Sequence, residues 1–257
     1  MDILRTSETN ALVSALKNVW QGGAPLTVEQ ATHLAPADNA AAYNVQKQLG
    51  KELSWWAADR PSAWKLTTGI PLLAAPVPDA NVISEHEATQ AFSPSTLCGI
   101  EIELACRLGR PITTKMSLEE IAESIAVTLP AIEIFDVRAL GWQELPKTFL
   151  LADLQMHGKL IIGEGIKGWK ADSELRVKSG DSLNPTLEWP SPAQNLLASL
   201  SWLAGHVDQQ GWSLQAGDLI STGSWCGVIE MAPDARIYAA FKNIGAIRID
   251  LKKLIKE

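Results

Sequence analysis

The residues best suited to chemistry are three glutamates in apolar, strand-like surroundings. Glu101 and Glu103 lie two positions apart in 99–108, where side chains alternate between two faces, so both carboxylates point to one side. Glu133 lies in a second apolar run, 129–137. Burying like charges together is costly unless a cation lies between them. The pattern indicates a divalent cation site, and a solvated strand face explains alternating glutamates about equally well.

The chemistry of these side chains indicates which metal such a site would bind. Hard carboxylate oxygens as the ligands favour Mg²⁺ or Mn²⁺ over zinc, and such ions keep positions open for substrate. Three cysteines in the chain have no close metal-ligand spacing and no disulfide framework: Cys98, Cys106 and Cys226. This cysteine usage favours a reducing compartment, and we expect a cytoplasmic protein.

Composition places the chain among folded globular proteins. Of its 257 residues, 46% are hydrophobic and 20% are charged, which excludes disorder and fibrous repeats. The net charge of -7 disfavours a nonspecific nucleic-acid surface. The first eight residues are too polar for a signal peptide, and no window reaches the roughly 18 apolar residues of a membrane span. We therefore expect a soluble protein without nucleic-acid or membrane partners.

The elements that must position the glutamates follow from hydrophobic periodicity. Helical spacing predicts helices at the start of the chain, and Thr27 with Gln30 forms a possible capping box. Later segments read as a mixture of helices and strands. The predicted helices are 3–20, 38–56, 117–124 and 192–209, and the predicted strands are 99–108, 129–137, 160–162, 219–220 and a hairpin of 237–241 with 247–251. We predict an α+β protein with a helical N-terminal cap, 1–75, and a metal-binding catalytic domain, 76–257.

Five stretches of the sequence, in the same order, resemble the 2-keto-4-pentenoate hydratase and 4-oxalocrotonate decarboxylase branch of the fumarylacetoacetate hydrolase superfamily. Together they cover most of the chain, which is far more specific than any one of them. They are AAYNVQ at 41–46, WKLT at 64–67, EIE at 101–103, LPAIEIFDVR at 129–138, and the C-terminal portion 199–251 with its STGS at 221–224.

The resemblance implies a fold, a site and a reaction. A helical N-terminal part would pack on a mixed β-roll, and Glu101, Glu103 and Glu133 would hold Mg²⁺ or Mn²⁺. A 2-oxo acid would chelate that ion through its keto oxygen and a carboxylate oxygen, so that negative charge developing on enolisation is stabilised. The implied enzyme is a hydratase or decarboxylase acting on a small 2-oxo or 2-hydroxydienoate acid, such as 2-hydroxypenta-2,4-dienoate, from aromatic-compound breakdown.

The resemblance also assigns roles to other residues. Lys65 would bind the substrate anion or move a proton, although a lone lysine is otherwise most often a surface residue. Hydroxyls near the end of a strand would hold a carboxylate, and without the resemblance they would be turn residues. The expected substrate-binding residues are Asp153, Ser221, Thr222 and Ser224.

The chain departs from the family pattern at one informative place. Where hydratases and decarboxylases of this branch have Asp-Asn-Ala-Ser-Ser-Gly, residues 153–158 are Asp-Leu-Gln-Met-His-Gly. The polar side chains that would contact substrate or water in the family are therefore replaced in this chain. His157 is a candidate general acid or base, because histidine titrates near neutral pH. A hydrogen-bonded structural histidine is the alternative.

Two competing functions stay open. His86 and Glu87 invite comparison with the His and Glu that activate water in the family's carbon-carbon hydrolases, which would make the protein an acylpyruvate hydrolase. A solvated loop explains the same pair. The rewritten segment 153–158 is also consistent with a non-catalytic member that binds a 2-oxo acid. Family members usually self-associate, and ten tryptophans are compatible with a subunit interface, so we expect a homo-oligomer.

Overall fold

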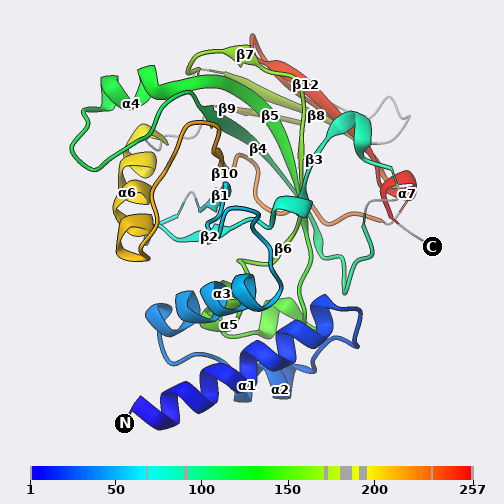
Figure 1. Cartoon of the computed structure of the whole chain (residues 1–257). Coiled ribbons are helices and arrows are strands. Elements are labelled where there is room, and N and C mark those ends of the chain that lie inside the picture. Colours follow the sequence, from blue (N-terminus) through cyan, green and yellow to red (C-terminus); the bar gives the residue numbers. More distant parts are fainter. Residues whose placement is uncertain are drawn as a thin grey trace.

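The computed structural model describes residues 2–67, 69–89, 92–170, 173–179, 187–190, 196–232 and 234–255. Two sheets face each other in one part of the molecule, and a layer of helices lies at the other end (Figure 1). The predicted α+β class with a mixed, curled sheet is confirmed. Within the described residues, every helix is too short or too polar to span a lipid bilayer.

The larger sheet has eight strands in the order β2-β1-β10-β4-β5-β6-β3, and β7 also pairs with β5. Its two long central strands, β4 and β5, are antiparallel and correspond to the predicted strands that carry the glutamates. The strands are β1 (Ala63–Leu66), β2 (Ala74–Pro76), β3 (Val82–Ser84), β4 (Gly99–Leu108), β5 (Ile125–Phe135), β6 (His157–Ile162), β7 (Ile166–Lys167) and β10 (Leu219–Ser224).

The smaller sheet has the order β12-β11-β8-β9 and covers one face of the larger sheet. The predicted C-terminal hairpin is its β11–β12 pair. Apolar side chains of both sheets meet in one core, with Ile102 and Ile132 from the larger sheet and Ala239 and Ile247 from the smaller. The strands are β8 (Glu174–Ser179), β9 (Leu187–Pro190), β11 (Arg236–Phe241) and β12 (Gly245–Asp250).

Helices α1, α2, α3 and α5 form the helical layer (Figure 1). Their bounds are α1 (Asp2–Trp20), α2 (Val28–His33), α3 (Asn39–Glu52) and α5 (Lys147–Ala152). The capping box of Thr27 and Gln30 is present at the start of α2. The Gln46 amide donates to the carbonyl of Leu151 over 2.6 Å. This buried bond ties α3 to α5, which the sequence did not predict.

Three further helices flank the sheets: α4 (Leu118–Ser124), α6 (Leu196–Gln209) and α7 (Leu251–Leu254). The apolar faces of α4 and α6 share a core with β1 and β10. The start predicted for the last long helix, at residue 192, lies outside the described residues. Short 3₁₀ helices occupy Asp79–Asn81, Glu85–Glu87 and Trp142–Glu144.

The predicted boundary between residues 75 and 76 falls within β2. Strand β1 precedes this boundary, yet it pairs with β10 of the larger sheet and contributes Lys65 to that sheet. Helices α1 to α3 alone therefore correspond to the predicted cap. How the chain divides into folding units stays a prediction.

Candidate metal centre and active site

Three carboxylates lie together on the face of the larger sheet that points away from the core between the sheets. Glu101 on β4 is paired directly with Glu133 on β5, and Glu103 follows two residues along β4. Each glutamate offers one oxygen, and these oxygens all lie within 4.8 Å of one another. Like charges directly opposite on neighbouring strands destabilise a sheet, so this arrangement requires compensation.

The two fully buried glutamates have one oxygen engaged and one free. The Oε2 atom of Glu103 accepts the backbone N–H of Gly223 over 3.1 Å, whereas no described residue bonds its Oε1. In Glu133, Oε1 accepts hydrogen bonds and Oε2 has no partner among the described residues. A buried acceptor without a partner is costly. The free oxygens are therefore the ones available to a ligand.

A bulge in β10 delivers the N–H that Glu103 accepts. The pairing of β10 with β4 shifts register between Ser221 and Ser224. Gly223 lies inside this irregularity with a φ of 91°, a left-handed conformation that glycine adopts at little cost. The bulge therefore aims a backbone donor at one oxygen of the carboxylate and leaves the other open.

Lys65 is a buried cation beside the cluster. It lies on β1 opposite Ser221, and its side chain is 4% exposed. Its Nζ donates to Glu133 Oε1 over 2.6 Å and to the carbonyl of Gln155 over 3.0 Å. The ammonium also lies 5.2 Å from the centre of the Phe135 ring. The lysine that the resemblance singled out is thus adjacent to the predicted metal ligands.

The electrostatics of the cluster point to a missing positive charge. Burial raises the pKa of Glu101 to about 7, and Glu133 adds to the rise while Lys65 opposes it. Burial, followed by Glu133 and Glu101, raises the pKa of Glu103 well above its usual value. For Glu133, burial would raise the pKa, but Lys65 and His157 outweigh it and lower the pKa. A cation among the three would favour the charged form of each.

His157 contacts the same oxygen of Glu133 as the lysine. Its Nδ1 lies 2.9 Å from Glu133 Oε1, and the side chain is fully buried. Burial lowers the pKa of His157, although Glu133 opposes this. The ring is therefore neutral at pH 7, and Nδ1 carries the proton because a carboxylate oxygen only accepts. No described residue bonds Nε2, which is left as a buried acceptor.

The segment just before His157, which departs from the family pattern, has a left-handed backbone conformation. Leu154, Gln155 and Met156 have φ values of 50°, 54° and 65°, so three consecutive non-glycine residues are left-handed. Each costs roughly 1–2 kcal/mol relative to the right-handed form. Such strain persists where a site requires the geometry. Here it directs the Gln155 carbonyl at Lys65, and the Met156 carbonyl accepts the N–H of Asp136.

Gln155 is a candidate functional residue that the sequence reasoning missed. The residue is 6% exposed, and neither Nε2 nor Oε1 of its side chain has a partner within the described part of the chain. A buried amide without partners loses the hydrogen bonds that its NH₂ group donates and its oxygen accepts in water, unless a ligand replaces them. The signal was its position in the segment that departs from the family pattern.

Asp153 has a structural environment instead of the expected substrate-binding one. Its Oδ2 accepts the backbone N–H of Arg138 over 2.8 Å, and its Oδ1 accepts Nε of Arg138 over 2.7 Å. Burial raises the pKa of Asp153 to about 6, and Arg138 opposes this rise. Both carboxylate oxygens of Asp153 are thus bonded to Arg138, which is itself almost fully buried.

The three predicted hydroxyl residues have different environments. The Ser221 Oγ is buried without a partner among the described residues, and it lies opposite Lys65. Thr222 donates to the carbonyl of Leu104 over 2.8 Å, so its hydroxyl serves the sheet. The Ser224 hydroxyl donates to the carbonyl of Gly227 over 3.1 Å, and its interaction with Glu101 slightly opposes the rise in the pKa of that carboxyl. Ser221 is therefore the freest of the three for a ligand.

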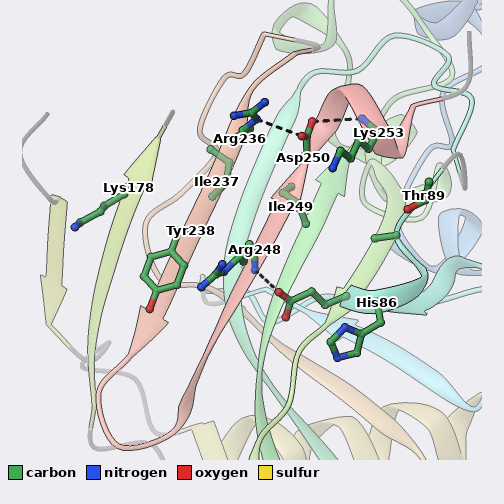
Figure 2. A pocket seen from close by; sticks show the side chains of 12 residues that line it. His86, Thr89, Lys178, Arg236, Ile237, Tyr238, Arg248, Ile249, Asp250 and Lys253 are labelled. Atoms are coloured by element: carbon green, nitrogen blue, oxygen red, sulfur yellow. Dashed lines mark hydrogen bonds and ion pairs between the residues drawn. The ribbon is translucent and has the colours of Figure 1, made fainter. Parts of the chain in front are cut away.

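The structure does not bring His86 and Glu87 to the carboxylate cluster. The His86 side chain is 78% exposed, and its Nε2 lies 3.9 Å from the exposed Glu164. Glu87 is also exposed and accepts the hydroxyl of Ser84 over 2.6 Å. His86 instead lines a surface cavity around the outer face of the smaller sheet (Figure 2).

The residues present fit a divalent cation. Three carboxylates lie beside one ammonium, so two negative charges are left without a counterion, and His157 is neutral. Free oxygens are the donors that hard ions such as Mg²⁺ prefer. Together they fit the charge and the ligand preference of one such ion.

Comparisons with known proteins add a family context to this geometry. No family model matches the chain. The chain is 25% identical over 154 residues to 2-keto-4-pentenoate hydratase 2 of Dechloromonas aromatica (strain RCB), and the match spans 58% of each chain. The chain thus covers a little over half of this curated relative.

Among solved structures, the chain is similar to 4-oxalocrotonate decarboxylase from Pseudomonas putida G7, complexed with magnesium and adipate. The TM-score is 0.73 at 15% identity, and the similarity covers 96% of this chain and 97% of that one. A putative fumarylacetoacetate hydrolase family protein from Yersinia pestis CO92 aligns with a TM-score of 0.52 at 16% identity, over 73% of this chain and 92% of that one. The chain has the fumarylacetoacetate hydrolase fold. The chain is thus similar in sequence to a hydratase, and in fold to a decarboxylase, of the branch that the sequence resembles.

Proposed function

We propose that the chain is a divalent-metal-dependent lyase, a hydratase or decarboxylase, acting on a small 2-oxo or 2-hydroxydienoate acid. The observation that carries the proposal is the set of free, buried oxygens on Glu103 and Glu133 beside the ammonium of Lys65. The relatives support it, since one is named as a hydratase of a 2-keto acid and another as a decarboxylase complexed with magnesium and a dicarboxylate.

Glu101, Glu103 and Glu133 would hold Mg²⁺ or Mn²⁺ in the proposed enzyme. When bound, the ion supplies a Lewis acid that stabilises negative charge developing on the keto oxygen of the substrate. The protein positions the three carboxylates on two rigid central strands. The Gly223 N–H and the Lys65 ammonium hold two of them in fixed orientations.

Lys65 is the residue that we assign to proton movement and anion binding. Its Nζ has three protons, and two of them are used by Glu133 and by the carbonyl of Gln155. The third is available to a substrate carboxylate or to a carbon that takes up a proton. Burial beside the cluster excludes competing water, which strengthens this interaction.

Substrate contacts would come from groups that are buried and unpartnered within the described residues. Ser221 Oγ and the Gln155 amide can donate to or accept from the substrate, and His157 Nε2 can accept. All of them are neutral, so they suit hydroxyl, keto or water oxygens better than a second carboxylate. A monocarboxylate with a polar tail therefore suits this site better than a dicarboxylate.

The test is a comparison of products. The metal-loaded protein is incubated separately with 2-hydroxypenta-2,4-dienoate, with 4-oxalocrotonate and with an acylpyruvate, and products are followed by mass spectrometry. We expect a product one water heavier from the dienoate, or a product that has lost carbon dioxide from the oxalocrotonate. Pyruvate released only from the acylpyruvate would contradict the proposal. Oxalate binding without turnover of any substrate would favour a non-catalytic binder.

We assign His157 the role of a positioning residue that orients Glu133. Replacing it with Phe removes the Nδ1–H donor, and we expect Mn²⁺ affinity to fall about 10–100-fold, as is typical when a group that hydrogen-bonds a metal ligand is removed. Isothermal titration calorimetry with Mn²⁺ measures this change. His157→Asn, whose amide can donate to Glu133 in place of the ring, should recover most of the affinity. Equal affinity in wild type and His157→Phe would refute the assignment.

A further inference from the structure

The surface cavity that His86 lines is separate from the carboxylate cluster and lies on the outer face of the smaller sheet. It has a volume of ≈ 640 Å³ and is lined by β8, β11, β12, Lys253 of α7 and the segment 85–89 (Figure 2). The inner face of the same sheet packs into the core that it shares with the larger sheet. The carboxylate cluster lies on the opposite face of that larger sheet. Both sheets and their shared core therefore separate the two sites.

The register of the strands brings cationic side chains together in this cavity. Lys178 on β8 and Arg248 on β12 both pair directly with Tyr238 on β11, so the three side chains form one row across the sheet. The Arg248 guanidinium lies 5.3 Å from the centre of the Tyr238 ring, which holds it on the sheet surface. Two strand spacings separate Lys178 from Arg248, on the order of 10 Å. Lys253 adds positive charge at the other end of the cavity, where Arg236 is paired with Asp250 (Figure 2).

The acidic residues of the cavity do not neutralise this row. Asp250 binds Arg236 Nε over 3.2 Å and the backbone N–H of Lys253 over 3.4 Å. Glu85 accepts the backbone N–H of Arg248, not its guanidinium, over 3.2 Å. Within the described ranges of the chain, no carboxylate pairs with the side-chain charge of Lys178, Arg248 or Lys253. A local excess of positive charge is notable in a chain whose net charge is -7.

We propose that this cavity binds a small organic anion with two separated anionic groups, such as a bisphosphate. One group would bind between Lys178 and Arg248 over Tyr238, and the other would bind at the end of the cavity where Lys253 lies. Charge-assisted hydrogen bonds from guanidinium and ammonium groups suit phosphate oxygens. The site is independent of the proposed lyase site, so it provides a place where a second metabolite acts on this protein.

The test is calorimetric titration of the full chain with fructose 1,6-bisphosphate as the probe, at low ionic strength. We expect one site per chain and affinity at least about tenfold tighter than for inorganic phosphate. Arg248→Gln and Lys178→Gln should each weaken the bisphosphate about tenfold. Lys115→Gln removes an equal charge from an exposed loop outside the cavity and should leave affinity unchanged.

Other outcomes would overturn the proposal. Equal weakening by all three substitutions would indicate a diffuse effect of net charge, and competition by oxalate would place the probe in the carboxylate site. Because Arg248 and Lys178 are exposed, their substitutions should leave the melting temperature within about 2 °C of wild type. Association with phosphatidylserine vesicles that Arg248→Gln abolishes, without bisphosphate binding, would identify a membrane surface in place of a small anion.

Discussion

Glu103→Gln is expected to weaken Mg²⁺ or Mn²⁺ binding at least about 100-fold and to reduce turnover by a similar factor. The substitution keeps the size of the side chain but replaces a charged oxygen by an amide at a position that is fully buried. Hard cations require anionic oxygen ligands, and the two remaining carboxylates are partly offset by Lys65. Calorimetric titration with Mn²⁺ measures the loss directly.

The same variant separates a metal effect from a folding defect. Because burial already disfavours the charged form of Glu103 and raises the pKa of its carboxyl, its neutral amide isostere should change the stability of the metal-free protein by less than about 1 kcal/mol. Added Mn²⁺ should raise the melting temperature of wild type but not of the variant. Glu164→Gln, at a side chain that is 94% exposed, is the matched control. Unchanged Mn²⁺ affinity in Glu103→Gln would disprove the proposed centre.

Asp153→Asn is expected to reduce the free energy of unfolding by about 3 kcal/mol at pH 7.5. Arg138 is 1% exposed, so loss of its partner leaves a buried guanidinium with little compensation. The amide of the introduced asparagine also places an NH₂ donor opposite an N–H group of Arg138 whose hydrogen bond the carboxylate accepts. Asp136, 3.4 Å from Arg138, keeps the cost at the lower end of the range for buried pairs.

Urea denaturation at pH 7.5 measures this change, because the Asp153 carboxyl, with a pKa of about 6, is charged there. An exposed pair provides the comparison. Glu123→Gln removes the partner of Arg110, whose side chain is 49% exposed, and should cost less than about 1 kcal/mol. The Asp153→Asn and Arg138→Met double variant should recover part of the loss. A single substitution at Asp153 as mild as that at Glu123 would show that the pair contributes little.

The parts of the fold with strong periodicity were predictable from the sequence. Alternation in 99–108 places Glu101 and Glu103 on one face, and the structure pairs that strand with the one carrying Glu133. The capping box at Thr27 is equally local, since both of its partners lie within one turn. In these elements, the residues that determine the structure are close together in the sequence.

The remaining parts depend on contacts or backbone conformations that the sequence does not reveal. Helix α5 has six residues, too few for a periodic signal, and packing against α3 stabilises it. Lys65 reaches the site because β1 pairs with β10, more than 150 residues later, and only the family resemblance indicated its role. The left-handed run 154–156 contains no glycine or asparagine to announce it. The same run explains why Gln155 was missed.

Lys65 bonds the main-chain carbonyl of Gln155 and not its side chain. The lysine anchor therefore depends on where the polypeptide runs and not on which amino acid occupies position 155. Substitutions at Leu154, Gln155 or Met156 that preserve the path of the main chain can change the shape and polarity around a substrate while leaving this anchor in place. The surroundings of the proposed substrate can thus change at these three positions without loss of the contact that holds Lys65.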